Sequence, residues 1–464
     1  MYSRRMLHLW NTLHHRLEPF IPLHDRRVGL YACGPTVYNP PTIGNWRAFV
    51  FDDLVVRTFR CFGFDVTYVM NITDVGHLVG DGDAGEDKVE REAARRGMNA
   101  WDLARSLEQD FRHGMSQLNI CVPDMMPRAT EHIAEQIELV RILEQRGHTY
   151  RTSDGIYFDT STFPAYGSLS GQRLEDKQAG ARVEMNKEKH QPADFALWKF
   201  SSTDVAVPRR QMEWSSPWGI GFPGWHVECS AMSTKYLGQP FDVHIGGIDH
   251  IPVHHENEIA QSEAAFGKPL ARYWLHNEFL MVDGRRVGKS EGNAFTLDDL
   301  LSRGYDPLAY RYYCLGTHYR MKLNFTWEGM EGASHAWKRL QQEARSLPLT
   351  TIAGEIPETV LAAMEDDFNT PRVLAAMWEM LASNASAQVK AATLMKVDTI
   401  LGLGLERWLG QTTEIPATIV RLAEARNTAR RDQDWLQADA LRETLLSQGW
   451  IVEDETDGYR LKPL

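Results

Sequence analysis

The chain has 464 residues, a net charge of -12 and 43% hydrophobic residues, a composition typical of globular proteins and not of fibrous or disordered ones. The acidic balance argues against general adhesion to nucleic acid, although a local basic groove stays compatible with it. The cysteines are sparse and odd in number, which favours a reducing compartment over a disulfide framework. No apolar run approaches a membrane span and no signal-peptide core is present, so we expect a cytoplasmic protein without a membrane partner.

The first part of the chain predicts a βαβ unit. Residues 28–33 form an apolar run that ends in a GPT turn, and residues 66–74 form a second strand-like run. Between them, apolar residues recur at helical spacing from Phe49 to Phe62. Such a unit implies a parallel sheet that binds ligands at the carboxyl ends of its strands. Cys33, residues 42–45 (TIGN) and residues 71–74 (NITD) should therefore share one edge.

The middle of the chain predicts an insertion and then a return to the sheet. Residues 100–147 are largely helical in pattern, and a hairpin signature follows around 153–155. We expect an α/β insertion over 116–205, strands at 241–247 and 273–282, and a helix carrying HHENE. The loop 283–293 has three glycines and three cations, which suits either a phosphate cradle or a plain surface turn.

The last part of the chain predicts helices and a small terminal unit. Residues 294–345 should be a helical stem-contact region, 346–410 a helical bundle and 411–464 a separate α/β unit. Residues 1–115 and 206–293 then form a split Rossmann-like catalytic domain. The terminal unit carries a basic stripe, which predicts either a solvated face or an RNA contact: Arg421, Arg426, Arg430 and Arg431.

A metal site is suggested by four residues. His254 and Glu258 are four positions apart and would project from one face of a helix, while Cys229 lies upstream and Cys33 ends the first strand. Two thiolates, an imidazole and a carboxylate suit tetrahedral zinc. The spacing is equally compatible with a buried small Cys229 and a solvated His254, because no CxxC pair anchors the site.

These segments together resemble the cysteinyl-tRNA synthetase family of class I aminoacyl-tRNA synthetases. The resemblance covers nearly the whole chain and rests on the order of YACGPTVYN, DFALWK, GWHVECSAM, GGID with HHENEIAQSEAA, KSEGN and MEDDFNTP. It implies one zinc ion on Cys33, Cys229, His254 and Glu258, and ATP with Mg2+. It also implies L-cysteine and tRNA(Cys) as substrates, with the insertion at the acceptor end and the C-terminal parts at the anticodon stem and loop.

The resemblance also assigns individual residues. It places the amino acid against Gly34, Thr36, Trp225 and His244, with a core aromatic as the alternative for Trp225. It gives catalytic roles to Thr42, Gly44, Asn45, Lys289 and Ser290, and ATP contacts to Gly44, Asn45, Gly246, Gly247, Asp249, Arg286, Val287 and Lys289. Zinc would select cysteine because its thiolate can bind the metal directly, whereas the serine hydroxyl is poorly acidic, so no editing site is required.

Two signatures depart from the family pattern. The HIGH signature reads Thr42-Ile43-Gly44-Asn45 here, and the KMSKS signature reads Arg286-Val287-Gly288-Lys289-Ser290. Loss of one transition-state donor typically costs about a hundredfold in rate, so the loss of an imidazole at Thr42 predicts slow activation of cysteine. An Asn at position 45 keeps an amide donor, and Gly288 should loosen its loop.

Three other functions compete with tRNA charging by a monomeric ligase. A cysteine ligase acting on a small amine would lack residues 355–464, which are present here. A catalytically weakened paralogue that binds cysteine, zinc or RNA is compatible with the altered signatures. A zinc hydrolase fits poorly, because HHENE lacks the two-histidine spacing of HExxH.

Overall fold

The computed structural model describes residues 5–76, 78, 87–172, 187–202, 204, 209–288, 291–411, 415–455 and 458–463. The chain divides into two compact units. The first comprises residues 1–337, 355–383 and 396–404, and the second comprises residues 338–354, 384–395 and 405–464. Among the described residues, no helix is both long enough and apolar enough to cross a membrane.

The first unit is organised around a parallel four-stranded sheet. Its strand order is β11 (Ala271–Asn277), β10 (Phe241–Gly247), β3 (Arg27–Ala32) and β4 (Asp65–Met70). The chain runs outward from β3 to β4 and, in the other direction, from β10 to β11, so the topological switch point lies between β3 and β10. Ligands bind at such a point in open α/β sheets. The predicted Rossmann-like fold is thereby confirmed.

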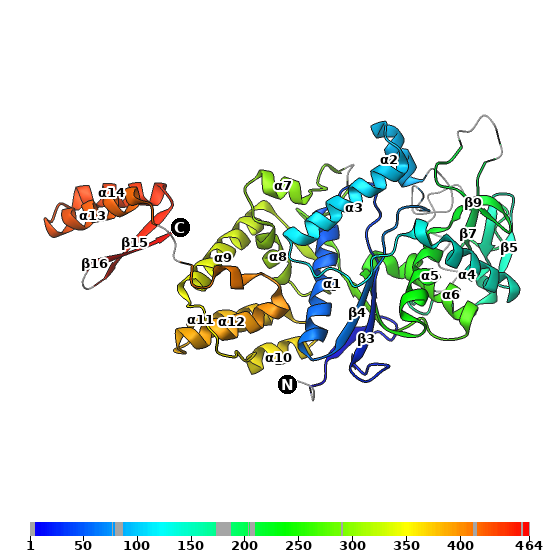
Figure 1. The fold of residues 1–464 in the computed structure, drawn as a ribbon, viewed down its shortest axis with the longest axis horizontal. Coiled ribbons are helices and arrows are strands. Elements are labelled where there is room, and N and C mark those ends of the chain that lie inside the picture. The colour runs from blue at the N-terminus through cyan, green and yellow to red at the C-terminus, as the bar shows by residue number, and fades with distance from the viewer. Residues whose placement is uncertain are drawn as a thin grey trace. The chain divides into compact units, whose positions relative to one another are not determined.

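Helices cover both faces of this sheet (Figure 1). Helix α1 (Ile43–Cys61) connects β3 to β4 and contacts both strands, and α5 (Trp225–Leu237) contacts the same two strands. Because α1 also packs against α8 (Pro307–Leu315), most of its surface is buried, including Phe49, Leu54 and Phe59. The burial explains why its sequence is apolar on more than one face.

The strand predicted over 273–282 is in fact two strands. Strand β11 ends at Asn277, and β12 (Leu280–Val282) joins another sheet with β13 (Arg285–Arg286) and β14 (Leu323–Phe325). The break has a physical cause, because the buried guanidinium of Arg47 donates hydrogen bonds to the carbonyls of Glu278 (2.8 Å) and Phe279 (2.6 Å). These carbonyls are thus turned away from the ladder of the central sheet.

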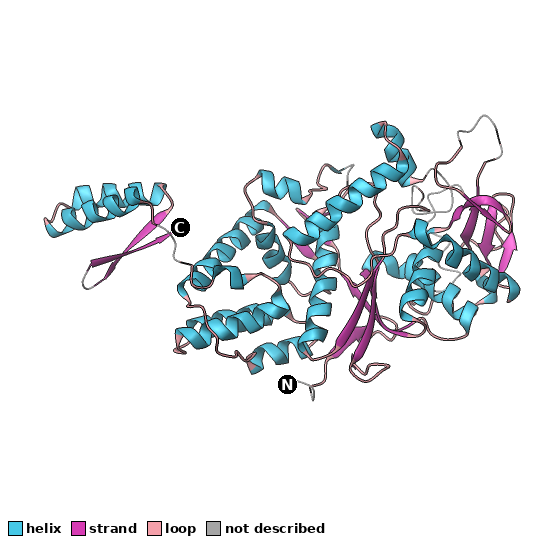
Figure 2. Cartoon of the chain, in the orientation of Figure 1, coloured by secondary structure: helices cyan, strands magenta, loops and turns pink. Residues whose placement is uncertain are grey.

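The insertion contains an antiparallel five-stranded sheet, seen as a separate group of strands in Figure 2. Its order is β5 (Thr149–Arg151), β6 (Gly155–Phe158), β7 (Phe195–Phe200), β9 (Gly219–Pro223) and β8 (Trp214–Ser216). The sheet thus continues past the boundary expected at residue 205, because β9 pairs with β7. Its core also includes apolar residues of α4 (Ile133–Gln145), α5 and α6 (Glu256–Phe266).

The remaining elements of the first unit surround the sheet. They include β1 (His8–Asn11), β2 (Arg16–Pro19), α2 (Lys88–Arg96), α3 (Ala100–Gln117), α7 (Leu297–Ser302), α10 (Glu358–Glu365) and α11 (Thr370–Ala382). The helices expected to form one bundle over 346–410 are shared by the two units. Helices α10 and α11 lie in the first unit, and the division falls within α9 (Trp327–Ser346) and α12 (Ala387–Leu401).

The C-terminal part of the second unit has its own small core. It contains α13 (Ala417–Arg431), α14 (Trp435–Ser447) and the hairpin of β15 (Trp450–Glu455) and β16 (Gly458–Pro463). The predicted basic stripe on α13 is interrupted, because Arg426 is only 4% exposed and is paired with Asp454 at 2.7 Å. Arg430 contacts the same carboxylate, whereas Arg421 and Arg431 are exposed.

Candidate active site

Four side chains far apart in the sequence meet at the carboxyl edge of the central sheet. Cys33 directly follows β3, Cys229 lies on α5, His254 lies in a π-helical turn (η5, Ile251–His255) and Glu258 lies in the first turn of α6. Their ligand atoms all lie within 4.8 Å of one another. Although His254 is not in a regular α-helix, its Nε2 still lies 3.0 Å from Glu258 Oε1. The structure thus brings together the four residues that the sequence suggested as metal ligands.

A second set of donors overlaps the first. Cys33, His244, His255 and Glu258 also have ligand atoms within 4.8 Å of one another. Cys33 Sγ lies 3.3 Å from His255 Nε2, and His244 Nε2 lies 3.0 Å from Glu258 Oε2. Sequence reasoning missed His255, for which the only signal was the doublet at 254–255. Because the sets share Cys33 and Glu258, they are alternatives for a single ion.

Further imidazoles support the candidate ligands. His226 Nδ1 lies 2.9 Å from His254 Nδ1, and His276 Nε2 lies 2.7 Å from His255 Nδ1. His276 is in turn bonded through Nδ1 to the hydroxyl of Thr12 at 2.8 Å. The second nitrogen of His254 and of His255 is therefore engaged, which fixes the orientation of both rings.

Burial and mutual contact shift the pKa values of these groups in opposite directions. Burial alone would raise the pKa of Glu258, but His244 and His254 outweigh it and hold that pKa well below its usual range. A hydrogen bond from Cys33 lowers the pKa of Cys229 to about 6, while burial and the Cys229 thiolate raise the pKa of Cys33. Burial would lower the pKa of His254, but Glu258 and Cys229 raise it to about 10, so this imidazole must release its proton to bind a cation beside the thiolate and the carboxylate.

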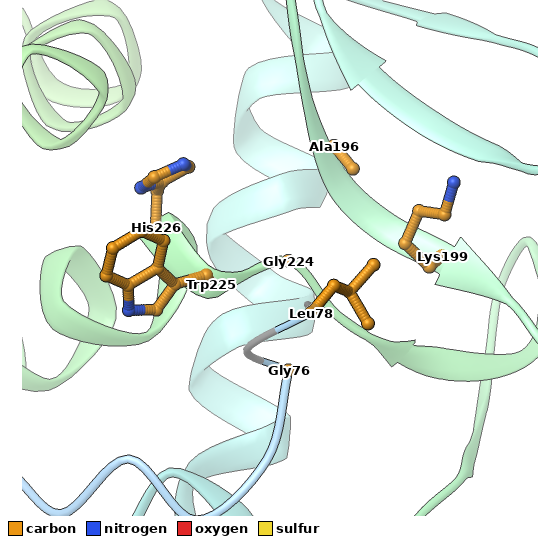
Figure 3. Close-up of a pocket in the computed structure, with 7 residues that line it drawn as sticks. All are labelled: Gly76, Leu78, Ala196, Lys199, Gly224, Trp225 and His226. Atoms are coloured by element: carbon orange, nitrogen blue, oxygen red, sulfur yellow. The ribbon is translucent and has the colours of Figure 1, made fainter. Parts of the chain in front are cut away.

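Trp225 forms a wall beside this cluster. Its indole stacks on the imidazole of His254, with ring centres 4.6 Å apart and an interplanar angle of 27°. Figure 3 shows Trp225 at the border of a small hollow that is also lined by Gly76, Leu78, Ala196, Lys199, Gly224 and His226. The ammonium of Lys199 pairs with the carboxylate of Asp154. Trp225 is half-buried, so its indole can contact a small molecule bound beside the cluster.

The loop after β3 is held tightly against the loop after β4. The amide of Gly34 donates to the side chain of Asn71 at 2.9 Å, and Thr36 pairs with Thr73 in a backbone bridge. A β-carbon at Gly34 would lie 1.7 Å from the Asn71 carbonyl oxygen, so only glycine permits this approach. His244, also expected at the amino acid, is fully buried and bonded to Glu258. In the structure it supports a candidate ligand.

The first signature caps α1 at the same edge of the sheet. Thr42 is the N-cap residue, and its side chain and that of Asn45 each accept a hydrogen bond from the other's backbone amide. Gly44 lies in the first turn, where an added β-carbon would meet a methyl of Val287 at 3.7 Å. Val287 belongs to the second signature, so the two signatures are neighbours. Lys289 and Ser290 lie outside the described residues.

The other residues that were expected to contact ATP also lie near this edge. Gly246 and Gly247 end β10, and Asp249 follows in the exposed turn η4 (Ile248–His250). A β-carbon at Gly246 would collide with the imidazoles of His250 and His255, which accounts for glycine there. Arg286 is exposed and places its guanidinium 5.0 Å from the centre of the Phe279 ring.

Comparison with known proteins assigns the chain to a family. Residues 19–335 match the family of class I (C) tRNA synthetase catalytic domains, residues 359–406 the DALR domain, and residues 412–460 the cysteinyl-tRNA ligase anticodon binding domain. A cysteine--tRNA ligase 1 from Burkholderia lata is 47% identical over 98% of this chain and 96% of its own length. The chain belongs to the cysteine--tRNA ligase family. A family member from Treponema denticola is 42% identical over 99% of this chain and its full length.

Solved structures of other class I synthetases share the fold of this family member. A Mycobacterium tuberculosis methionyl-tRNA synthetase in complex with methionyl-adenylate has a TM-score of 0.53 at 15% identity, covering 86% of this chain and 94% of its own. An Agrobacterium radiobacter K84 leucyl-tRNA synthetase in a ternary complex has a TM-score of 0.56 at 13% identity, covering 84% and 85%. At these identities the likeness concerns the fold alone.

Proposed function

We propose that this chain activates L-cysteine with ATP and transfers it to tRNA(Cys). The observation that carries the proposal is the convergence of Cys33, Cys229, His254 and Glu258 at the switch point of the sheet, beside the capped start of α1. Family membership supports the reaction type. The family matches over 359–406 and 412–460 favour tRNA over a small amine as the acceptor.

Zinc fits the first donor set by its chemistry. Two sulfur atoms, one imidazole nitrogen and one carboxylate oxygen are ligands that tetrahedral zinc prefers, and the imidazole of His254 is itself supported by His226. A bound zinc ion would supply a position at which the thiolate of cysteine binds and the hydroxyl of serine does not. We assign Cys33, Cys229, His254 and Glu258 to this ion, with His244 supporting Glu258.

The chain's own residues account for the other parts of the site. Trp225 would form one wall of the amino-acid pocket, and the loop that contains Gly34 and Thr36 would close the opposite side. Negative charge grows on phosphate oxygens during adenylate formation, so donors and cations there matter more than a general base. We keep Ser290 as a catalytic residue. ATP would arrive with Mg2+, and we assign its contacts to Gly44, Asn45, Gly246, Gly247, Asp249, Arg286, Val287 and Lys289. We place the enzyme in the cytoplasm, as a monomer.

The test is aminoacylation of tRNA(Cys) with radiolabelled cysteine by the purified full-length chain, with small amines as competing acceptors. Charged tRNA together with cysteine-dependent ATP–pyrophosphate exchange is the expected result. Exchange with transfer only to an amine would replace the proposal with a small-molecule ligase. Cysteine binding without exchange would identify a catalytically inactive paralogue, which the altered signatures keep as the second candidate.

A further inference from the structure

Two neighbouring helices in the first unit begin with the same cap. At α1, the Thr42 amide and hydroxyl donate to Asn45 Oδ1 at 2.9 and 2.8 Å. At α7, the Thr296 amide and hydroxyl donate to Asp299 Oδ2 at 2.7 and 2.8 Å. The caps are adjacent, because Thr42 and Thr296 form a backbone bridge. The chain therefore contains two copies of one capping arrangement, in which the accepting group is an amide in α1 and a carboxylate in α7.

That difference fixes the direction of a hydrogen-bond donor. Two donors of Thr42 face Asn45 Oδ1, and only an oxygen can accept both, so the amide cannot be reversed. The Nδ2 hydrogens of Asn45 must then point away from the cap. Asn45 is exposed, and its Nδ2 makes no hydrogen bond with the described residues. The carboxylate of Asp299 has no donor to present.

The first turns of α1 and α7 also differ in charge, and this difference likewise favours an anion at α1. The first turn of α1 carries no acidic side chain, so the positive end of a 19-residue helix is left for an anion. The first turn of α7 already holds Asp298 and Asp299, which neutralise the corresponding end. Val287 of the second signature lies beside Gly44, which places the α1 cap where both signatures meet.

We propose that Thr42 is a positioning residue for the activation step, holding the amide of Asn45 so that Nδ2 donates to a phosphate oxygen of ATP. The inference rests on the proposed function and deepens it. Thr42 thus acts through Asn45 and does not itself replace an imidazole as a donor. The substitution at Thr42 is compensated locally, and the slow activation expected from the altered signature does not follow from it.

The test compares isosteric variants at the two caps. Thr42→Val and Thr296→Val each remove one hydroxyl from an equivalent cap and should lower the midpoint of thermal unfolding alike. Only Thr42→Val should lower kcat for cysteine-dependent ATP–pyrophosphate exchange, by on the order of tenfold, because Asn45 loses one of its two orienting donors. Thr42→Ser, which keeps the hydroxyl, should retain the exchange rate of the parent.

A double-mutant comparison shows whether Thr42 acts through Asn45. Asn45→Ala should lower kcat by about a hundredfold, and adding Thr42→Val to it should cost nothing more. Equal losses in Thr42→Val and Thr296→Val, additive losses in the double variant, or a faster Thr42→His enzyme would each overturn the role of Thr42. A parent without cysteine-dependent exchange would instead overturn the proposed function itself.

Discussion

Replacing His244 by Phe tests which of the two overlapping donor sets holds the metal. His244 is fully buried on β10, and its ring stacks on Trp274 with centres 4.5 Å apart and an angle of 17°. A phenyl ring keeps this packing and removes the bond from Nε2 to Glu258 Oε2 at 3.0 Å. Nδ1 of His244 has no hydrogen-bond partner among the described residues, so nothing else is lost.

The size of the effect follows from the position of His244 relative to the metal. If zinc is held by Cys33, Cys229, His254 and Glu258, His244 only supports a ligand, and its loss should weaken zinc binding by about 10–100-fold, or ~1.4–2.7 kcal/mol. The matched variant His254→Phe also keeps an aromatic stack, here with Trp225, but removes a direct ligand. It should weaken zinc binding further, by roughly a quarter of the ~10–16 kcal/mol typical of structural zinc.

The assay is a competition titration of each full-length variant against a chromophoric zinc chelator. The predicted order of affinity is parent, then His244→Phe, then His254→Phe. The reverse order for the two variants would assign the ion to Cys33, His244, His255 and Glu258 and refute our choice of ligands. Retention of parental affinity by both variants would show that neither set holds the metal.

Two further variants test the core and its pH response. Arg311→Met removes one of the two guanidiniums that pair with the buried carboxylate of Asp53, leaving Arg57 at 2.7 Å, and it removes a bond to the Leu401 carbonyl (2.7 Å). The loss of a charged hydrogen bond together with a buried carbonyl's donor should lower the unfolding free energy by about 3–5 kcal/mol in urea denaturation; a loss below ~1 kcal/mol would contradict this. Burial raises the pKa of Asp74 from 3.8 to about 6, so the folded state retains this proton more strongly than the unfolded chain. The unfolding free energy should therefore fall as pH rises from about 4 to 6, and Asp74→Asn should flatten that slope; an unchanged slope would exclude Asp74 as its source.

Much of the first unit could be predicted from local patterns. The apolar run 28–33, the helix that follows and the run 66–74 correspond to β3, α1 and β4, because a buried parallel strand and a buried helix each leave a recognisable periodicity. The split between β11 and β12 could not be predicted in this way. It depends on Arg47, which lies more than two hundred positions away in the sequence and donates hydrogen bonds to the carbonyls of Glu278 and Phe279.

The candidate site shows the same limit. Spacing pointed to His254 and Glu258, but nothing in the doublet at 254–255 distinguishes a ligand from a supporting imidazole. That depends on which other donors each ring meets in the folded chain, Cys229 for His254 and His244 for His255. Likewise, the sequence places Arg426 in a basic stripe, whereas in the structure it pairs with Asp454 on β15. Contacts between distant segments decide both cases, and periodicity carries no information about them.

We propose that a metal ion on Cys229 and its neighbours selects a thiol-bearing amino acid. The most direct measurement determines bound zinc and the relative exchange rates with cysteine and serine, for the purified parent and for Cys229→Ser. We predict one zinc per chain and a strong preference for cysteine in the parent, with both lost in the variant. A parent free of zinc, or a variant that still prefers cysteine as strongly, would contradict the account.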